Sequence, residues 1–233
     1  MKKSLIAGLI ALTASPALFA ASYKVEVQNL TRGIYFTPLI VSAHPASAKF
    51  FTAGTAASTN LQKMAEGGDI SGLSVDMTNA GAKSVDNPAA GLLVPGASTM
   101  ANLGDPGTTN TQLSIVAMML PTNDGFIALN NMTLPTAKGT YTYMLNAYDS
   151  GTEANNEIRG GGAPGAAGMP VPPPLESLVG KNGTGIAGAT AEGFVHIHRG
   201  ALGDTDLNAG KSDINAESQR WLNPVARITV TVE

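Results

Sequence analysis

Cysteine is absent from the 233 residues of this chain. Disulfide bonds and a lipoprotein anchor are therefore excluded, and the fold must be stabilised by core burial or by a bound ion. Charge is also scarce, because only 13% of the residues are charged, the net charge is -3, and lysine and arginine form no cluster after residue 20. A phosphate backbone would find little to bind, so nucleic acid is not expected as a partner.

Long hydrophobic runs are missing as well. The apolar run Leu5–Leu12 follows two lysines and is too short to span a bilayer. It predicts a cleavable export signal over residues 1–20, with cleavage after Ala20. Residues 21–233 are then expected to form one mature domain that is periplasmic or secreted. No later segment is apolar for long enough to give a transmembrane segment.

Strand-like patterns dominate what remains. Tyr23–Gln28 and Ala226–Val232 alternate apolar and polar residues, as half-buried strands do. Leu113–Leu120 is an apolar run of strand length, and the turn-rich Pro121–Gly125 connects it to the short apolar run Phe126–Leu129. These segments predict a central hairpin.

Other segments fit the same architecture. Ile34–Ala43, Tyr141–Tyr148 and Gly193–Arg199 are predicted to be strands. Asn60–Gly67 is the one short helix that the spacing predicts, and Gly160–Pro174 is too rich in Gly, Pro and Ala for regular structure. Because no long window shows helical periodicity, the predicted fold is all-β, an antiparallel β-sandwich with long loops and at most short helices.

Oxygen-bearing side chains follow two strands that are expected to be neighbours. Asp124 and Asn130 flank the second strand of the hairpin, and Asp149 and Glu153 follow the strand after it. Calcium takes about six to eight oxygen ligands, which loops at one end of a sandwich can supply. Asp and Asn are also ordinary turn residues, so the same pattern is compatible with turns that bind no ion.

The hairpin and the loop that follows resemble the paired signature of the spondin N-terminal domain family. Pro121–Asn130 reads PTNDGFIALN where that family shows PSPDWFVGVD, and Ala147–Glu153 contains DSGTE where the family shows DAGTD. Asn29–Thr31 and Asn223–Ile228 are similar to the corresponding ends of bacterial members. The resemblance therefore extends over nearly the whole mature chain.

This resemblance implies a β-sandwich similar to calcium-dependent membrane-binding domains, with an extracellular adhesive role and a surface glycan or protein as partner. It also implies one calcium ion held by loop carboxylates, and Asp124, Asp149 and Glu153 fall on the family's acidic positions. Three departures stand out: Gly125 replaces a Trp, and Asn130 and Glu153 each replace an Asp. Fewer charges predict weaker calcium binding.

The three histidines provide an alternative site. His196 and His198 lie two residues apart, which places both imidazoles on one face of a strand. His44 ends another predicted strand, so the three could bind copper or zinc if those strand ends meet. A solvated or hydrogen-bonded histidine face is the simpler interpretation of the same spacing.

Two further motifs are weaker. Asp204 and Asp206 begin like an EF-hand loop, but the expected glycine falls one residue late at Gly210, so we interpret this segment as an exposed loop. For catalysis, the chain has no Gly-x-Ser-x-Gly elbow and no phosphate-binding glycine motif. A non-enzymatic protein is therefore predicted.

Overall fold

The computed structural model describes residues 21–233, so the predicted export signal lies outside the described residues. No helix within this part of the chain is long and apolar enough to cross a membrane. The elements, in chain order, are β1 (Tyr23–Asn29), β2 (Tyr35–Phe36), β3 (Ile40–His44), α1 (Thr59–Gly67), α2 (Ser71–Asn79), β4 (Lys83–Asp86), β5 (Ser98–Gly104), β6 (Gln112–Leu120), β7 (Gly125–Thr133), β8 (Gly139–Asp149), a 3-10 turn (Pro173–Leu175), β9 (His196–Ile197) and β10 (Ala226–Val232).

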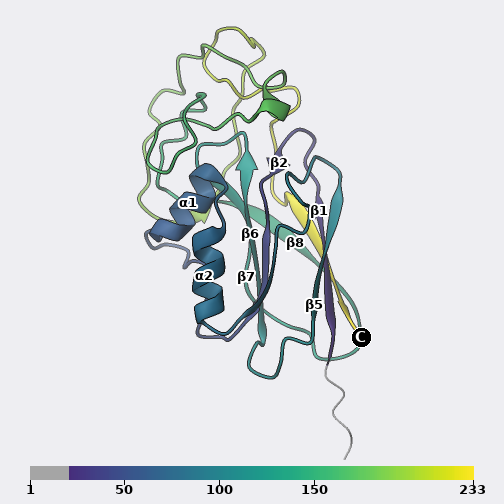
Figure 1. Ribbon diagram of the computed structural model, residues 1–233. Helices are drawn as coiled ribbons and strands as arrows, with labels where there is room; N and C mark the ends of the chain where they lie inside the picture. The colour runs from purple at the N-terminus through teal and green to yellow at the C-terminus, as the bar shows by residue number, and fades with distance from the viewer. Residues whose placement is uncertain (1–20) are drawn as a thin grey trace, which may run out of the picture.

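The strands form one curled antiparallel sheet, which confirms the all-β prediction. Its order is β4-β3-β6-β7-β8-β10-β1-β5, with β2 added to β6 and β9 added to β8. The two outer strands of this path approach each other, and Lys83 Nζ donates a hydrogen bond to the Asp105 carbonyl oxygen at 2.8 Å where they meet. The sheet is therefore nearly closed, and opposite parts of it face each other across a common core (Figure 1).

Strand β6 is buried along almost its whole length because both of its faces are covered. Ile115 and Ala117 point into the core enclosed by the curled sheet. Val116 and Met118 point the other way, into a second core between the sheet and the two helices. Strands β1 and β10 have only one covered face, which explains why they alternate and β6 does not.

Helix α1 packs on the outer face of β6 and β7, and helix α2 packs against β4 and β3 (Figure 1). Helix α1 matches the predicted helix: the Ser58 hydroxyl accepts a hydrogen bond from the Leu61 amide, and Gly68 ends the helix in the left-handed conformation. Helix α2 was not predicted. Only Leu73 and Met77 are buried on it, so its sequence carries too little apolar periodicity to mark a helix.

Two predicted strands are shorter in the structure than in the prediction. Ile34–Ala43 is interrupted, and the pieces on either side of Pro38 become β2 and β3. Within Gly193–Arg199 only β9 is a strand. The rest of the chain between β8 and β10 is almost entirely irregular and gathers at one end of the sheet (Figure 1).

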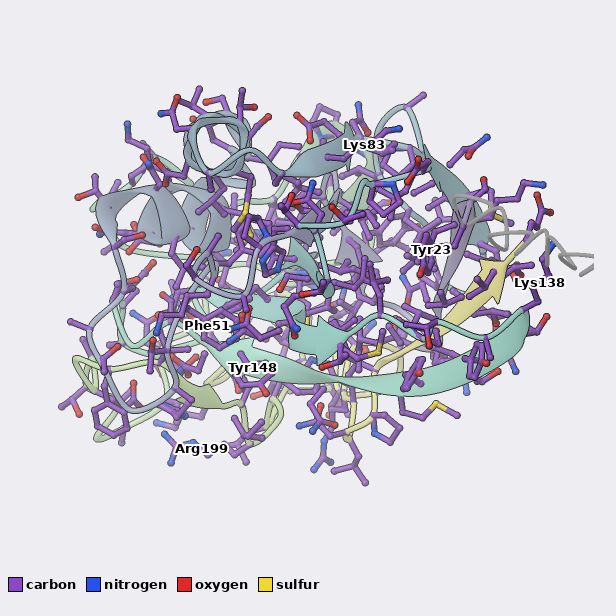
Figure 2. The ribbon with its side chains drawn as sticks, turned by 90° about the horizontal axis from the view of Figure 1, so that it is seen from below. Tyr23, Phe51, Lys83, Lys138, Tyr148 and Arg199 are labelled. Atoms are coloured by element: carbon purple, nitrogen blue, oxygen red, sulfur yellow. The ribbon has the colours of Figure 1, made fainter. Side chains whose placement is uncertain are left out.

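An aromatic cluster anchors the loop before α1 to the sheet. The Phe51 ring lies 5.4 Å from Phe126 on β7 and 5.0 Å from Tyr148 on β8, measured between ring centroids. Figure 2 shows Phe51 and Tyr148 close to each other. Tyr148 is the residue before Asp149, so this cluster fixes the end of β8 where the acidic loop begins.

Asn29 ties together the start of the domain and is fully buried. Its amide group donates to the carbonyl oxygens of Ile34 and Leu93, and its side-chain oxygen accepts from the backbone and hydroxyl of Thr31.

Asn29→Ala should lower the free energy of unfolding by about 2–4 kcal/mol, because it leaves these groups buried without partners. Urea denaturation would measure this loss. The exposed Asn79→Ala is the control, and an equal effect of both changes would contradict the prediction.

Candidate metal centre

Asp149 lies at the centre of the acidic loop end and is 1% exposed. It is the last residue of β8, where the sheet register places it opposite Gly125 of β7 and His196 of β9. Its Oδ1 accepts the Gly151 amide at 2.8 Å, and its Oδ2 accepts the Asn155 side-chain amide at 2.7 Å. These two bonds fix the carboxylate in one orientation.

Glu192 and His196 converge on this carboxylate. His196 Nε2 lies 3.8 Å from Asp149 Oδ1 and 3.8 Å from Glu192 Oε2, and ligand atoms of the three residues lie within 4.8 Å of one another. His196 Nε2 and Glu192 Oε2 are both buried and have no hydrogen-bond partner. No other group of three potential ligands converges in this way among residues 21–233.

The hydrogen bonds of His196 determine which nitrogen faces the acids. Its Nδ1 lies 3.0 Å from the carbonyl oxygen of Ile197, which can only accept, so Nδ1 carries the proton. In the neutral ring, Nε2 then presents a lone pair to two carboxylates. Without a cation, the lone pair and the two negative carboxylates repel one another. A cation bound between the three groups would remove this repulsion.

His198 lies beside this group but faces it differently. It is 5% exposed, and its Nδ1 accepts the Gly200 amide at 3.1 Å, which leaves the ring proton on Nε2. Nε2 lies 3.9 Å from Asp149 Oδ2. Burial, followed by the neighbouring charges of His196 and Arg199, lowers the pKa of His198 to about 4. The neutral ring therefore directs an N–H group toward Asp149 and offers it no lone pair.

Asp124 organises the loop that follows β8. Its Oδ2 accepts hydrogen bonds from the Ser150 hydroxyl and from the amides of Thr152 and Glu153, at 2.9, 2.8 and 3.1 Å. Its Oδ1 is buried without a partner. Burial, together with the charge of Asp149, raises the pKa of Asp124 to about 7.

The remaining members of the predicted calcium cage point elsewhere. Glu153 Oε1 accepts hydrogen bonds from the Asn123 side chain and the Gly168 amide, and burial raises the pKa of this carboxyl. Asn130 lies five residues along β7 from Gly125, about 16 Å at the rise of a strand, and its amide donates to Phe51. The ligand atoms of Asp124, Asp149 and Glu153 do not all lie within 4.8 Å of one another, so calcium binding by these side chains stays a prediction.

His44 lies at the opposite end of the sheet from the other two histidines. The register aligns it with Gln112 and so with Thr133 of β7, while His196 is level with Gly125. Eight residues of β7 separate the two levels, about 26 Å. His44 hydrogen-bonds Ser114 Oγ and the Pro45 carbonyl oxygen. The proposed three-histidine site does not form, because no ion can bridge that distance.

Sequence reasoning missed Glu192. The only available signal was its position four residues before His196, in a segment without helical or strand periodicity.

The loop that begins like an EF-hand has a simpler explanation in the structure. The Asp204 carboxylate accepts hydrogen bonds from the backbone amides of Asp206 and Lys211 and so stabilises a turn.

The curled antiparallel sheet and its acidic, loop-built end define an all-β domain. The sequence profile of the spondin N-terminal family, Spondin_N, matches residues 15–159, more than half of the chain, and the chain belongs to this family. The family is one of extracellular domains. A search of the curated proteins finds no match. Asp124, Asp149 and Glu153 lie within the matched range, whereas Glu192 and His196 lie beyond it.

Proposed function

We propose that this protein is an exported, non-enzymatic binding domain of the spondin type that takes up one divalent metal ion at Asp149, Glu192 and His196. The observation that carries the proposal is the convergence of three ligand atoms within 4.8 Å, two of them buried without a hydrogen-bond partner. Asp149 ends β8, His196 begins β9, and Glu192 comes from the irregular segment between these two strands. An ion would therefore order the loops at this end of the domain.

The donor set favours zinc over calcium. Calcium prefers oxygen ligands alone, whereas two carboxylates with one imidazole suit zinc, and copper is the second choice. Ligands about 2 Å from a tetrahedral ion lie about 3.3 Å apart, so the 3.8 Å separations need only a small contraction. The Nδ1–H bond of His196 to a carbonyl is the usual second contact of a metal-bound imidazole.

Isothermal titration of the purified, chelator-treated protein with zinc and, separately, with calcium tests the proposal. We expect one zinc ion per chain and weaker or no calcium binding. His196→Gln and Glu192→Gln should each weaken zinc binding by at least about 100-fold, because each removes a direct ligand. The exposed Glu217→Gln is the control and should bind like the wild type.

Two outcomes would contradict this assignment. Uptake of neither ion, with no change in melting temperature on adding zinc, would exclude a metal site. Tight calcium binding that survives His196→Gln would instead favour the carboxylate site predicted from the family resemblance. Both variants should melt like the wild type in chelator, which separates loss of a ligand from loss of the fold.

The ordered loops would form the surface that meets a glycan or protein partner. Support for this role comes from the family, whose domains are extracellular, and from the position of the site at the loop end of the sheet. Binding to candidate surfaces with and without chelator would test it, and the expected result is binding that requires the ion.

A further inference from the structure

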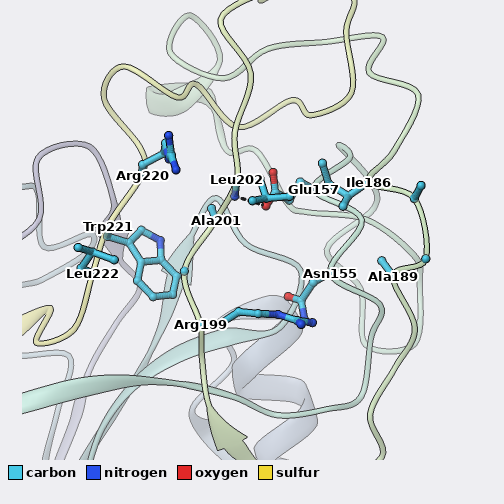
Figure 3. A pocket seen from close by; sticks show the side chains of 13 residues that line it. Asn155, Glu157, Ile186, Ala189, Arg199, Ala201, Leu202, Arg220, Trp221 and Leu222 are labelled. Carbon is cyan, nitrogen blue, oxygen red and sulfur yellow. Dashed lines mark hydrogen bonds between the residues drawn. The ribbon is translucent and has the colours of Figure 1, made fainter.

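A pocket of about 800 Å³ lies next to the metal centre and is separate from its ligands. It is lined by Asn155, Glu157 and residues 186–189, 199–202 and 220–222 (Figure 3). These segments are far apart in the chain, and all belong to the irregular region after β8. Ligand sites in proteins usually occupy about 300–1,000 Å³, so the pocket has the size of a small-molecule site.

Trp221 gives the pocket wall an unused hydrogen-bond donor. Its side chain is buried, and its indole nitrogen has no acceptor. Figure 3 shows the nitrogen on the edge of the ring that faces Ala201. The His198 ring contacts the indole ring, with 4.7 Å between the two ring centroids, and this contact fixes the orientation of the indole. Buried N–H groups are rarely left unpaired, so this donor points to a ligand oxygen.

The one acidic residue that lines the pocket is already hydrogen-bonded within the chain. Glu157 is buried, and its carboxylate oxygens are occupied by donors of the protein. Three donors surround it: the amides of Leu202 and Gly203 and the hydroxyl of Ser212.

Two arginines, Arg199 and Arg220, line the same pocket. Arg199 is engaged by Glu192, at 3.2 Å between Nη2 and Oε1. Arg220 makes no ion pair within residues 21–233 and is exposed. In Figure 3 the Arg220 side chain and the Trp221 nitrogen lie on the same side of the pocket. A guanidinium and a neutral N–H together form a binding site for a carboxylate.

Apart from Asn155, whose side-chain amide donates to Asp149, the other side chains of the lining are apolar. Ile186, Ala189, Leu202 and Leu222 carry no hydrogen-bonding side chain, and Leu202 and Leu222 are exposed at 58% and 83%. Exposed leucines beside a cationic end favour a ligand with an apolar body. We propose that this pocket binds an organic carboxylate with an apolar body, the carboxylate held by Arg220 and Trp221 Nε1 and the body against these leucines.

The test uses the single tryptophan of the chain as the reporter. Its indole N–H signal in a proton–nitrogen NMR spectrum comes from the pocket alone. Titration with benzoate or octanoate, in chelator, should move this signal. The neutral benzamide and the acid sugar glucuronate should bind more weakly. Arg220→Gln should weaken benzoate binding by about tenfold, and Arg227→Gln on β10, outside the pocket, should not.

Several results would overturn the proposal. These are an indole signal that no carboxylate moves, benzamide binding as tight as benzoate binding, tighter binding of glucuronate, or an Arg220→Gln protein that binds like the wild type. Movement by inorganic phosphate alone would show a general anion site and would also overturn it. Because the titration is done without metal, its failure is distinct from failure of the zinc site.

Discussion

Phe126→Ala is expected to lower the free energy of unfolding by about 3–5 kcal/mol, which is a large fraction of the stability of a domain. The Phe126 ring is fully buried, lies 5.4 Å from Phe51 and stacks on Tyr148 at 5.8 Å. Removing it opens a cavity in the second core and releases two aromatic neighbours. Urea denaturation followed by fluorescence or circular dichroism measures the loss, provided that the denaturant slope is unchanged.

Two companion variants make this measurement specific. Phe126→Leu keeps most of the volume and should lose clearly less stability than the alanine variant. Met144→Ala removes an exposed side chain from β8 and should change stability by less than about 0.5 kcal/mol. A loss of similar size in all three proteins would contradict the assigned role of Phe126.

Asp124→Asn is expected to stabilise the metal-free protein at neutral and alkaline pH. The pKa of Asp124 is about 7 in the folded protein, against an ordinary value of 3.8. The folded state therefore favours the protonated carboxyl. That contribution is complete below about pH 4 and is lost as the pH rises through about 7. Over this window the wild type loses up to roughly 4 kcal/mol, an upper limit for a group coupled to Asp149.

Asparagine keeps the shape of the side chain without the charge. Its oxygen can accept the hydrogen bonds that Oδ2 accepts now, and its amide can occupy the place of the unpartnered Oδ1. The difference in unfolding free energy between variant and wild type should grow in favour of the variant from about pH 4 to pH 8, measured in chelator. The exposed Asp206→Asn makes the same charge change away from Asp149 and is the control. A flat difference for Asp124→Asn would contradict the prediction.

The sequence predicted the half-buried strands well because their alternation depends on local residues alone. β1 and β10 are found almost at the predicted bounds. It could not predict α2, which is held by tertiary packing of Leu73 and Met77 and has no amphipathic pattern of its own. β9 was overestimated for the related reason that an apolar pattern does not say how much of a segment finds a partner strand.

Part of the candidate site could also be predicted from the sequence. Asp149 and His196 were singled out from the sequence, but as members of different sites. The error with His44 came from strand order, because β3 and β8 run in opposite directions in this sheet, so their final residues lie at opposite ends. Glu192 depends on the course of an irregular segment, which packing determines and no period in the sequence records.

The double burial of β6 has a consequence for how the protein unfolds. Its odd and even residues supply two different cores, so the two hydrophobic layers share this strand as a common wall. Loosening the helices from the sheet would expose one side of the strand that closes the inner core. The two layers should therefore melt in a single cooperative transition, and a partly unfolded state that keeps only one of them should not accumulate.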